Sequence, residues 1–309
     1  MEMENRRLTN QKKNTELTGC LFVFAAGALW GLIGLFVKEM EHAGASPEMI
    51  SFLRVFFAFL IMTAATVWKK GIRVFLADRK TLFFCAALGV VCHGIYNVFY
   101  SLAVTLAGVS VSAVLLNIAP VFTLLFSVLL FSERFTGAKA AAAVINMLGC
   151  VLTATNGQIT LAGLSVFGIL CGVGAGLCYS MTAIIGRFAS DRTDSFVMSA
   201  YSYLFAALSL GVWMRPWRGM GTLNQKVVIW GFLYALIPTA IGYLLYYCGI
   251  ARIRESSKVP VIASVESVVA TLIGIFLYHE KIGPVSMAGI ALVLLSIWLM
   301  NGRGARVSG

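Results

Sequence analysis

Apolar residues form long runs along almost the whole chain, and polar residues gather in the short segments between them. Each run holds about 18 to 26 residues, long enough for a helix to cross the roughly 30 Å of hydrocarbon in a bilayer. The pattern therefore predicts ten membrane-spanning helices. We expect them at residues 19–38, 47–68, 82–104, 109–131, 138–156, 161–186, 196–214, 226–249, 258–278 and 284–301.

Composition supports a membrane protein and leaves no room for an aqueous domain. Hydrophobic residues make up 59% of the 309 residues and charged residues 12%, with a mean hydropathy of +0.87, far from the range of soluble chains. The longest connection covers residues 69–81. A separate catalytic or nucleic-acid-binding domain is therefore not expected.

The net charge of +11 has a topological explanation. With a cytoplasmic N-terminus, 18 of the 24 Lys and Arg residues fall on the cytoplasmic side, five fall on the other side, and Arg54 lies within a span. This bias fits the positive-inside rule and predicts a multi-pass protein with cytoplasmic tails at 1–18 and 302–309. The polar first 18 residues lack a small-residue cleavage site, so we expect the first run to be retained.

The second half of the chain repeats the first at an offset of 147 to 149 residues. Residues 114–137, VLLNIAPVFTLLFSVLLFSERFTG, align with residues 261–284, VIASVESVVATLIGIFLYHEKIGP. This alignment pairs Glu133 with Glu280, each at the exit of a span. We expect both carboxylates to act as caps or in ion pairs at the membrane surface.

The first span also has a counterpart in the second half. Residues 27–38, GALWGLIGLFVK, align with residues 176–187, GLCYSMTAIIGR, which pairs Trp30 with Tyr179. Each unit holds five spans, and an odd number forces the two units into opposite membrane orientations. The predicted fold is an all-α integral membrane protein of ten transmembrane helices in two inverted five-helix repeats. The repeats cover residues 19–156 and 161–301.

The repeated segments resemble the EamA-type branch of the drug/metabolite transporter superfamily, over about residues 19–301. The resemblance rests on the ten-span plan and on two segments closed by a glutamate, 119–137 and 265–283. It implies a bacterial inner-membrane exporter of amino acids and other metabolites, with a central cavity walled by spans one to four and six to nine. Members often carry Glu-Pro in the ninth span, whereas Glu266 is followed here by serine, which leaves Pro260 as the residue expected to break that helix.

Four polar side chains are expected in the middle third of the membrane: Arg54, His93, Asn117 and Glu266. A charged side chain at the bilayer centre costs about 2.5 to 3.5 kcal/mol, so Arg54 and Glu266 should face the protein interior. One explanation is an ion pair that only fastens the repeats together. We favour a wet, substrate-binding cavity, because hydrophobic pairs often stabilise as well as a buried ion pair.

The same residues suggest a ligand. The planar guanidinium of Arg54 suits a carboxylate, and Glu266 can accept hydrogen bonds from an ammonium group. Trp30, Tyr96 and Tyr179 can supply amphipathic walls or cation–π faces, although each fits ordinary packing as well. A zwitterionic amino acid or similar small metabolite matches both charges. Asn117 either joins this site or hydrogen-bonds a neighbouring helix.

Coupling and gating have candidate residues too. His93 or Glu266 is the expected carrier of a coupling proton, although a lone membrane histidine can equally be structural. Three prolines are candidate hinges or plain kinks: Pro120, Pro238 and Pro260. Small residues at helical spacing predict close helix contacts or a ridge on which the repeats rock. They are Gly168, Gly172, Gly176 and Ser180 in the sixth span, and Gly19, Gly27 and Gly31 in the first.

The sequence is compatible with three functional classes. The leading hypothesis is a secondary active transporter that exports small polar metabolites, amino acids first, by alternating access. An intramembrane enzyme would need a catalytic or zinc motif that the sequence lacks, and a passive channel or scaffold would show no saturable flux. We therefore expect no enzymatic activity, cofactor or metal, a small-molecule substrate, and contact with lipid but not nucleic acid. Whether the chain forms a homodimer stays open.

Overall fold

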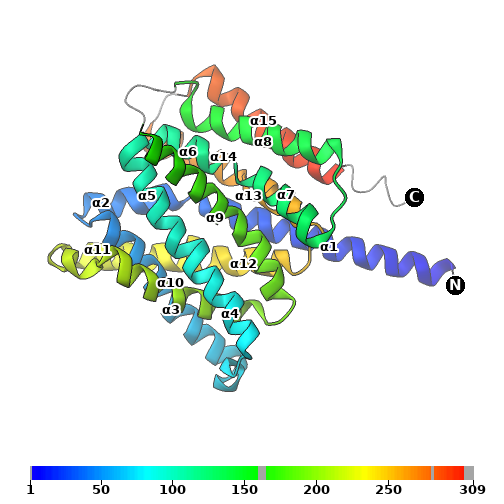
Figure 1. Ribbon diagram of the computed structural model, residues 1–309, viewed down its shortest axis with the longest axis horizontal. Coiled ribbons are helices and arrows are strands. Elements are labelled where there is room, and N and C mark those ends of the chain that lie inside the picture. The colour runs from blue at the N-terminus through cyan, green and yellow to red at the C-terminus, as the bar shows by residue number, and fades with distance from the viewer. Residues whose placement is uncertain (1, 159–164, 280–281, 303–309) are drawn as a thin grey trace.

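The computed structural model describes residues 2–158, 165–279 and 282–302, and in these ranges the chain folds entirely into helices and short connections (Figure 1). Ten stretches are long and apolar enough to cross a membrane, which confirms the predicted number and order of spans. Most boundaries agree within a few residues. The expected start of the sixth span at residue 161 lies outside the described residues, and its helix extends to Ser190 rather than to residue 186.

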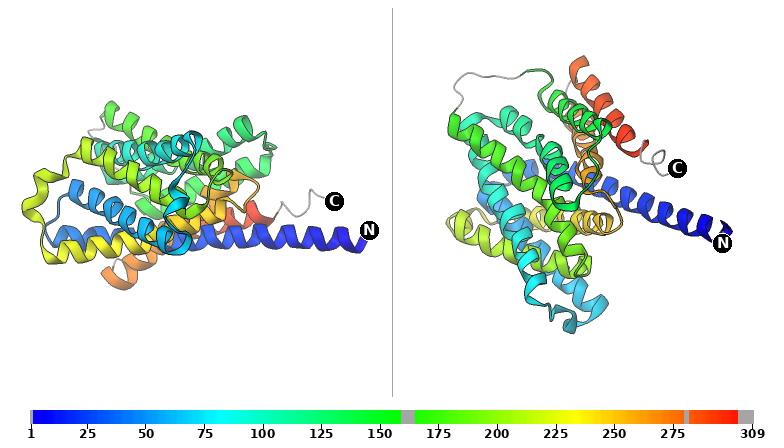
Figure 2. Two further views of the ribbon diagram at one scale, coloured as in Figure 1. Left: turned by 90° about the horizontal axis from the view of Figure 1, so that it is seen from below. Right: turned by 45° about the vertical axis from the view of Figure 1, so that its right-hand side comes forward.

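The first unit contains five spans, several of them built from more than one helical segment. They are α1 (Glu2–Trp30) with α2 (Ile33–His42); α3 (Pro47–Lys70); α4 (Arg79–Ala87), η2 (Leu88–Ile95) and α5 (Tyr96–Ala107); α6 (Val109–Leu116) with α7 (Ala119–Phe131); and α8 (Gly137–Thr155). Helix α1 begins well before the membrane-spanning stretch and projects from the bundle (Figure 2).

The second unit follows the same plan. Its spans are α9 (Val166–Ser190); α10 (Ser195–Met214); α11 (Gln225–Tyr234), η4 (Ala235–Ile241) and α12 (Gly242–Ile250); η5 (Ser256–Lys258), α13 (Val259–Ala263) and α14 (Val265–Tyr278); and α15 (Pro284–Gly302). Two short 3-10 turns, η1 (Ile72–Phe75) and η3 (Pro216–Thr222), lie in the connections.

Polar side chains fix where many of these helices begin, because the first backbone N–H groups of a helix have no partner within it. Ser46 accepts a hydrogen bond from the N–H of Met49 at the start of α3, and Asp194 accepts one from Phe196 at the start of α10. The same capping occurs at Asp78, Thr136, Ser165 and Asn224. The short polar segments between apolar runs therefore also stop and start the helices.

The two units share their irregular features, at the same offset of 147 residues that aligns the sequences. The π-helical turns η2 and η4 begin at Leu88 and Ala235. The fourth span is interrupted at Asn117 and the ninth at Ser264. The left-handed residues that end α7 and α14 are Ser132 and His279. A repeated set of departures from regular helix indicates one architecture used twice, in opposite orientation because each unit has five spans.

The three candidate hinge prolines occupy different positions. Pro120 and Pro260 lie in the first turn of α7 and α13, where a proline costs nothing because the N–H there has no helical partner. The ninth span is interrupted as expected, but at Ser264 rather than at Pro260 itself. Only Pro238 lies inside a helix, in η4.

The backbone carbonyl that Pro238 leaves without a helical partner accepts a hydrogen bond from a neighbouring side chain. Proline lacks an N–H and leaves a carbonyl of the preceding turn without a partner. The Thr239 hydroxyl donates to the Tyr234 carbonyl at 3.0 Å, and the Thr239 carbonyl in turn accepts a hydrogen bond from the Tyr203 hydroxyl at 2.9 Å. This chain of hydrogen bonds joins the seventh and eighth spans.

The small residues at helical spacing in the first and sixth spans lie at contacts between the units, which confirms the predicted close approach. A Cβ atom built on Gly27 would lie 2.4 Å from the Ala263 carbonyl oxygen of α13, and one on Gly176 would lie 2.8 Å from the Leu115 carbonyl oxygen of α6. Helices α8 and α15 pack against each other along one side of the bundle (Figure 1), so the fifth and tenth spans lie away from its centre.

Candidate functional site

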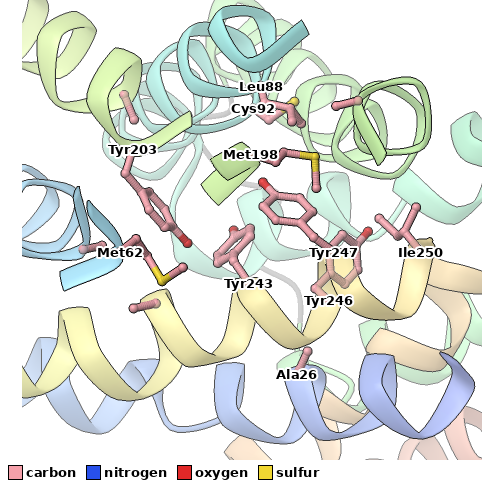
Figure 3. Packing of buried hydrophobic residues seen from close by; sticks show 14 of the residues in the cluster. Ala26, Met62, Leu88, Cys92, Met198, Tyr203, Tyr243, Tyr246, Tyr247 and Ile250 are labelled. Atoms are coloured by element: carbon pink, nitrogen blue, oxygen red, sulfur yellow. The ribbon is translucent and has the colours of Figure 1, made fainter. Parts of the chain in front are cut away.

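Aromatic rings from both units meet at the centre of the bundle. Tyr243 lies among them, with ring centroids 4.6 Å from Trp30, 4.8 Å from His93 and 6.1 Å from Tyr203. Figure 3 shows Tyr203, Tyr243, Tyr246 and Tyr247 within this core. We call the set the aryl cluster; its members are Trp30, His93, Tyr96, Tyr179, Tyr203, Tyr243, Tyr246 and Tyr247.

Local helix geometry explains how the eighth span supplies three of these rings. Tyr243, Tyr246 and Tyr247 are three and four residues apart, so they share one face of α12. Trp30, at the end of α1, packs 4.9 Å from Tyr246, and a Cβ built on Gly242 would lie 2.9 Å from its indole Nε1. The glycine therefore leaves the space that the indole occupies.

The structure brings together three aromatic residues predicted from the sequence. The ring of Tyr179 lies 6.4 Å from Trp30 and 6.0 Å from Tyr96. Trp30 and Tyr179 are equivalent residues of the two units, so the contact lies where the repeats face each other.

Arg54 is buried beside the aryl cluster, with only 6% of its surface exposed. Its guanidinium carbon lies 5.6 Å from the ring centroid of Tyr234, and the charge also interacts with Tyr243. Its Nε and Nη2 groups are buried without a hydrogen-bond partner, and no ion pair to Arg54 occurs in the part of the chain that the structure describes. A positive charge with two free donors thus faces the rings.

Glu266 lies in the first turn of α14, directly after the interruption of the ninth span. Its charge interacts with Tyr96, Tyr179 and Tyr243. Over residues 2–158, 165–279 and 282–302, no ion pair joins Glu266 to Arg54. The alternative of a direct ion pair that fastens the repeats is therefore wrong, and Tyr243 interacts with both charges.

His93 is 1% exposed and belongs to the π-helical turn η2. Its ring lies 4.8 Å from Tyr243 and 5.4 Å from Tyr203, and its Nε2 atom has no hydrogen-bond partner. The backbone carbonyl of His93 accepts a hydrogen bond from Asn97 at 2.5 Å. The imidazole is therefore held by packing, with one ring nitrogen available to a ligand or proton.

Among the described residues, Asn117 bonds its own helix rather than a neighbouring one. Its amide donates to the Ala113 carbonyl of its own helix at 2.8 Å, at the point where the fourth span is interrupted. The same Ala113 carbonyl also accepts the backbone N–H of Asn117 at 3.1 Å, so the side chain and the backbone of Asn117 together close the last turn of α6.

A second polar group joins the units at the end of the bundle where α7 exits. The Glu133 carboxylate accepts hydrogen bonds from the Ser256 N–H at 2.5 Å and the Ser257 hydroxyl at 2.6 Å. This confirms the predicted capping role of Glu133; its repeat partner Glu280 lies outside the described residues. Lys139 lies 3.8 Å from Glu133.

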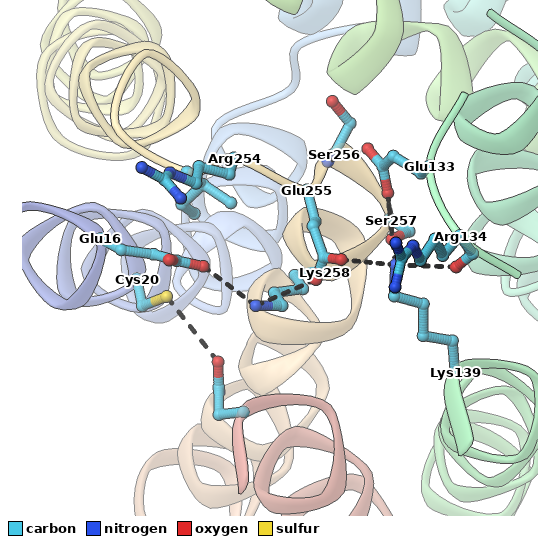
Figure 4. Close-up of polar contacts among 12 residues, drawn as sticks. Glu16, Cys20, Glu133, Arg134, Lys139, Arg254, Glu255, Ser256, Ser257 and Lys258 are labelled. Atoms are coloured by element: carbon cyan, nitrogen blue, oxygen red, sulfur yellow. Dashed lines mark hydrogen bonds and ion pairs between the residues drawn. The ribbon is translucent and has the colours of Figure 1, made fainter. Parts of the chain in front are cut away.

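Further ion pairs extend this group across the interface (Figure 4). Lys139 bonds Glu255 at 2.7 Å, and Lys258 lies 2.9 Å from Glu16 and 3.1 Å from Glu255. We call these residues the Glu133 clamp: Glu16, Glu133, Lys139, Glu255, Ser256, Ser257 and Lys258. Burial acts to raise the pKa of Glu255, but the hydrogen bond from Lys139 and the charge of Lys258 outweigh it and hold the pKa below its ordinary value.

Sequence reasoning missed parts of both groups. Tyr243 and Tyr247 stand 147 residues after Tyr96 and Tyr100, so the repeat offset could have identified them. The clamp left a weaker signal, since its charges lie in loops and at helix ends where isolated ion pairs are common.

The helical composition, the ten spans and the repeated interruptions define a membrane protein built from two inverted five-helix units. The model of the EamA-like transporter family matches residues 17–155 and 166–302. The chain therefore belongs to the EamA-like transporter family, within the drug/metabolite transporter superfamily.

Individual relatives agree with this family. An uncharacterized transporter of Archaeoglobus fulgidus is 24% identical over 276 residues, covering 89% of this chain and 93% of its own. The uncharacterized transporter YwfM of Bacillus subtilis is 24% identical over 293 residues, covering 91% and 93%. A protein of Streptantibioticus cattleyicolor named "Probable terminal-alkyne amino-acid exporter" is 23% identical over 229 residues, covering 73% and 74%.

A solved crystal structure has the same fold. It superposes with a TM-score of 0.76 at 18% identity, covering 91% of this chain and 97% of its own.

Proposed function

We propose that this protein is a secondary active transporter that exports small polar metabolites, amino acids first, across the bacterial inner membrane. The observation that carries the proposal is the separation of Arg54 and Glu266, two charges in membrane spans that form no ion pair with each other. Each charge costs about 2.5 to 3.5 kcal/mol at the bilayer centre, and a direct pair would have offset part of that cost. A ligand that carries both opposite charges would satisfy them together.

The surroundings of the two charges suit a zwitterion. The free Nε and Nη2 groups of Arg54 form the fork that binds a carboxylate through two hydrogen bonds. Glu266 would accept from the ammonium group, between Tyr96 and Tyr179, whose rings also attract cations. Tyr243, which interacts with both charges, would lie beside the bound substrate.

Alternating access requires that one end of the bundle closes while the other opens. The charge bias of the loops would place the Glu133 clamp, and both termini, on the cytoplasmic side. In the clamp, Glu16 of the first unit pairs with Lys258 of the second, Glu133 accepts from Ser256 and Ser257, and Lys139 pairs with Glu255. Its closure would prevent exported substrate from returning, and its release would admit substrate from the cytoplasm.

Coupling to protons would use Glu266 or His93. Neither side chain has an ion-pair partner among the described residues. A change in the charge of either would therefore change the electrostatic potential at the substrate site. Efflux from proteoliposomes should then accelerate when the pH gradient drives protons in the direction opposite to substrate. Efflux that is unaffected by the gradient would remove the coupling part of the proposal.

The test begins with a thermal-shift screen of the purified protein against amino acids and related metabolites, because a ligand of the folded state raises its stability. The compound that gives the largest shift is then measured for saturable counterflow in proteoliposomes. Arg54→Met and Glu266→Gln should each lower kcat/KM at least about 30-fold. The first variant leaves the substrate carboxylate without a partner, and the second leaves the substrate ammonium group without one. Arg54→Lys should recover part of the loss.

The matched control is Lys226→Met, which removes a positive charge from an exposed position at the start of α11. It should leave flux unchanged. Normal flux in both Arg54→Met and Glu266→Gln would refute the proposed site. Flux that does not saturate would indicate a channel, and chemical turnover without movement of the compound would indicate an enzyme.

A further inference from the structure

Asn146 is a buried amide on the peripheral helix α8, with 1% of its surface exposed. Its Nδ2 group donates to the Ser264 hydroxyl at 2.5 Å and to the Ser296 hydroxyl at 2.9 Å. Both serines belong to the second unit, whereas Asn146 belongs to the first. A single side chain therefore joins the fifth, ninth and tenth spans.

The chemistry of these contacts requires a side chain at position 146 that donates two hydrogen bonds. Each serine hydroxyl donates its proton to a backbone carbonyl of its own helix, Ser264 to Val261 at 2.6 Å and Ser296 to Val293 at 2.7 Å. Each serine oxygen is then left only as an acceptor. The two N–H bonds of the Asn146 amide match these two acceptors, whereas a carboxylate or an apolar side chain would offer no donor.

Ser264 is the residue at which the ninth span is interrupted, two positions before Glu266. The N–H of Ser267 bonds the Ser264 carbonyl at 3.0 Å, so Ser264 anchors the first turn of α14, which carries Glu266. Cys150, one turn after Asn146 on α8, contacts Ser264 and Ser267 and interacts with Glu266. The Asn146 contact is thus made at the residue that immediately precedes the helix carrying Glu266.

The equivalent interruption in the first unit is held differently. There the Asn117 amide bonds the Ala113 carbonyl of its own helix. The residue 147 positions after Asn146 is Val293, which is fully buried and has no polar side chain. The first interruption is therefore stabilised locally, and the second is held by a residue of the opposite unit.

We infer that Asn146 is a positioning residue: its hydrogen bond to Ser264 fixes the interruption of the ninth span and so sets the position of Glu266. The inference rests on the proposed function for the role of Glu266 in binding, but the contact and its test do not depend on the substrate. It assigns to the peripheral fifth span a direct part in shaping the central site.

The experiment measures the position of Glu266 without a transport assay. Dicyclohexylcarbodiimide modifies protonated carboxyl groups in apolar surroundings, and the modified peptide is quantified by mass spectrometry, with Glu266→Gln as the blank. Asn146→Leu, which keeps the branched shape but has no donor, and Ser264→Ala should each change the modification rate at least about twofold. Their double variant should show no further change, because both remove the same bond.

Ser296→Ala is the matched control, since it removes the other hydrogen bond of Asn146 and leaves the Ser264 contact in place. Its modification rate should equal that of the wild type. Equal effects of Ser296→Ala and Ser264→Ala, or wild-type rates in all variants, would overturn the inference. Circular dichroism and size-exclusion profiles matching the wild type identify the folded variants, and Asn146→Gln, which restores a donor, should move the rate back toward the wild-type value.

The two proposals can fail separately. Retained flux in Glu266→Gln, with an altered modification rate in Asn146→Leu, would refute the proposed site and keep the positioning role. Loss of flux in Glu266→Gln, with an unaltered modification rate in Asn146→Leu, would support the proposed site and refute the positioning role.

Discussion

The contact between the first and ninth spans gives a sharp test of the packing, through the substitution Gly27→Ala. The added Cβ would lie 2.4 Å from the Ala263 carbonyl oxygen and 2.8 Å from Val265. Real Cβ contacts stay above 3.0 Å, so the first contact alone requires a shift of at least 3.0 − 2.4 = 0.6 Å. The atom in the way is backbone, which cannot rotate aside as a flexible side chain can.

The chain provides its own control in Gly34→Ala on α2. Gly34 is exposed, and a Cβ built there meets nothing within 4 Å. Both substitutions gain about 1 kcal/mol of helix propensity. Only Gly27→Ala also incurs the cost of overpacking, about 1 to 3 kcal/mol. The difference between the two variants therefore isolates the steric cost of the interface.

The assay is thermal unfolding of the purified variants in detergent. A difference of 1 to 3 kcal/mol corresponds to roughly 2 to 12 °C in Tm, with Gly34→Ala the more stable variant. Gly27→Ala should also reduce flux, because it displaces the segment next to Ser264 and Glu266. Identical Tm values for the two variants would show that the helices separate without cost, and would refute the close approach described for Gly27.

Three further predictions concern the clamp and the eighth span. The pKa of Glu255 lies below its ordinary value of about 4.3, so the clamp should contribute its full stability above that pH and lose it as pH falls through the folded-state pKa. Tm measured against pH should show this loss in the wild type and a weaker one in Lys139→Met; identical profiles would contradict the assignment. Glu133→Gln should lower stability by about 1 to 3 kcal/mol, because the Ser256 N–H and the Ser257 hydroxyl bond different carboxylate oxygens and one of these buried donors loses its acceptor; unchanged stability in denaturant unfolding would contradict this. Thr239→Val should cost about 1 to 3 kcal/mol because the Tyr234 carbonyl loses its partner, and an unchanged Tm would show that another group replaces it.

Some features of the site could be read from the sequence because they depend on residue type and depth alone. Arg54, His93 and Glu266 stood out as polar residues in apolar runs, and Trp30 and Tyr179 stood out as equivalents in the repeat. The structure brings these five residues to the aryl cluster or beside it. The ion pair considered for Arg54 and Glu266 was wrong, because sequence position gives the depth of a side chain but not its direction.

The contacts of Asn117 and Asn146 also show that sequence does not give the direction of a side chain. Asn117 was expected at the site or bonded to a neighbouring helix, and its amide makes a bond within its own helix, which does not support the second of these roles. Asn146 lies in the middle of the fifth apolar run, and its sequence context gives no sign that it bonds two other helices. Which neighbour a polar side chain meets depends on how each helix is rotated.

The sequence by itself determined the number, order and inverted repetition of the spans. It could do so because a chain crossing hydrocarbon must satisfy its backbone within continuous apolar helices, which is a local requirement on composition and length. Only the tertiary structure decided that Arg54 and Glu266 remain apart, that Tyr243 lies near both, and that Asn146 holds the ninth span. Helices apolar on every face carry little information about which face meets a neighbour, so packing between helices makes that choice.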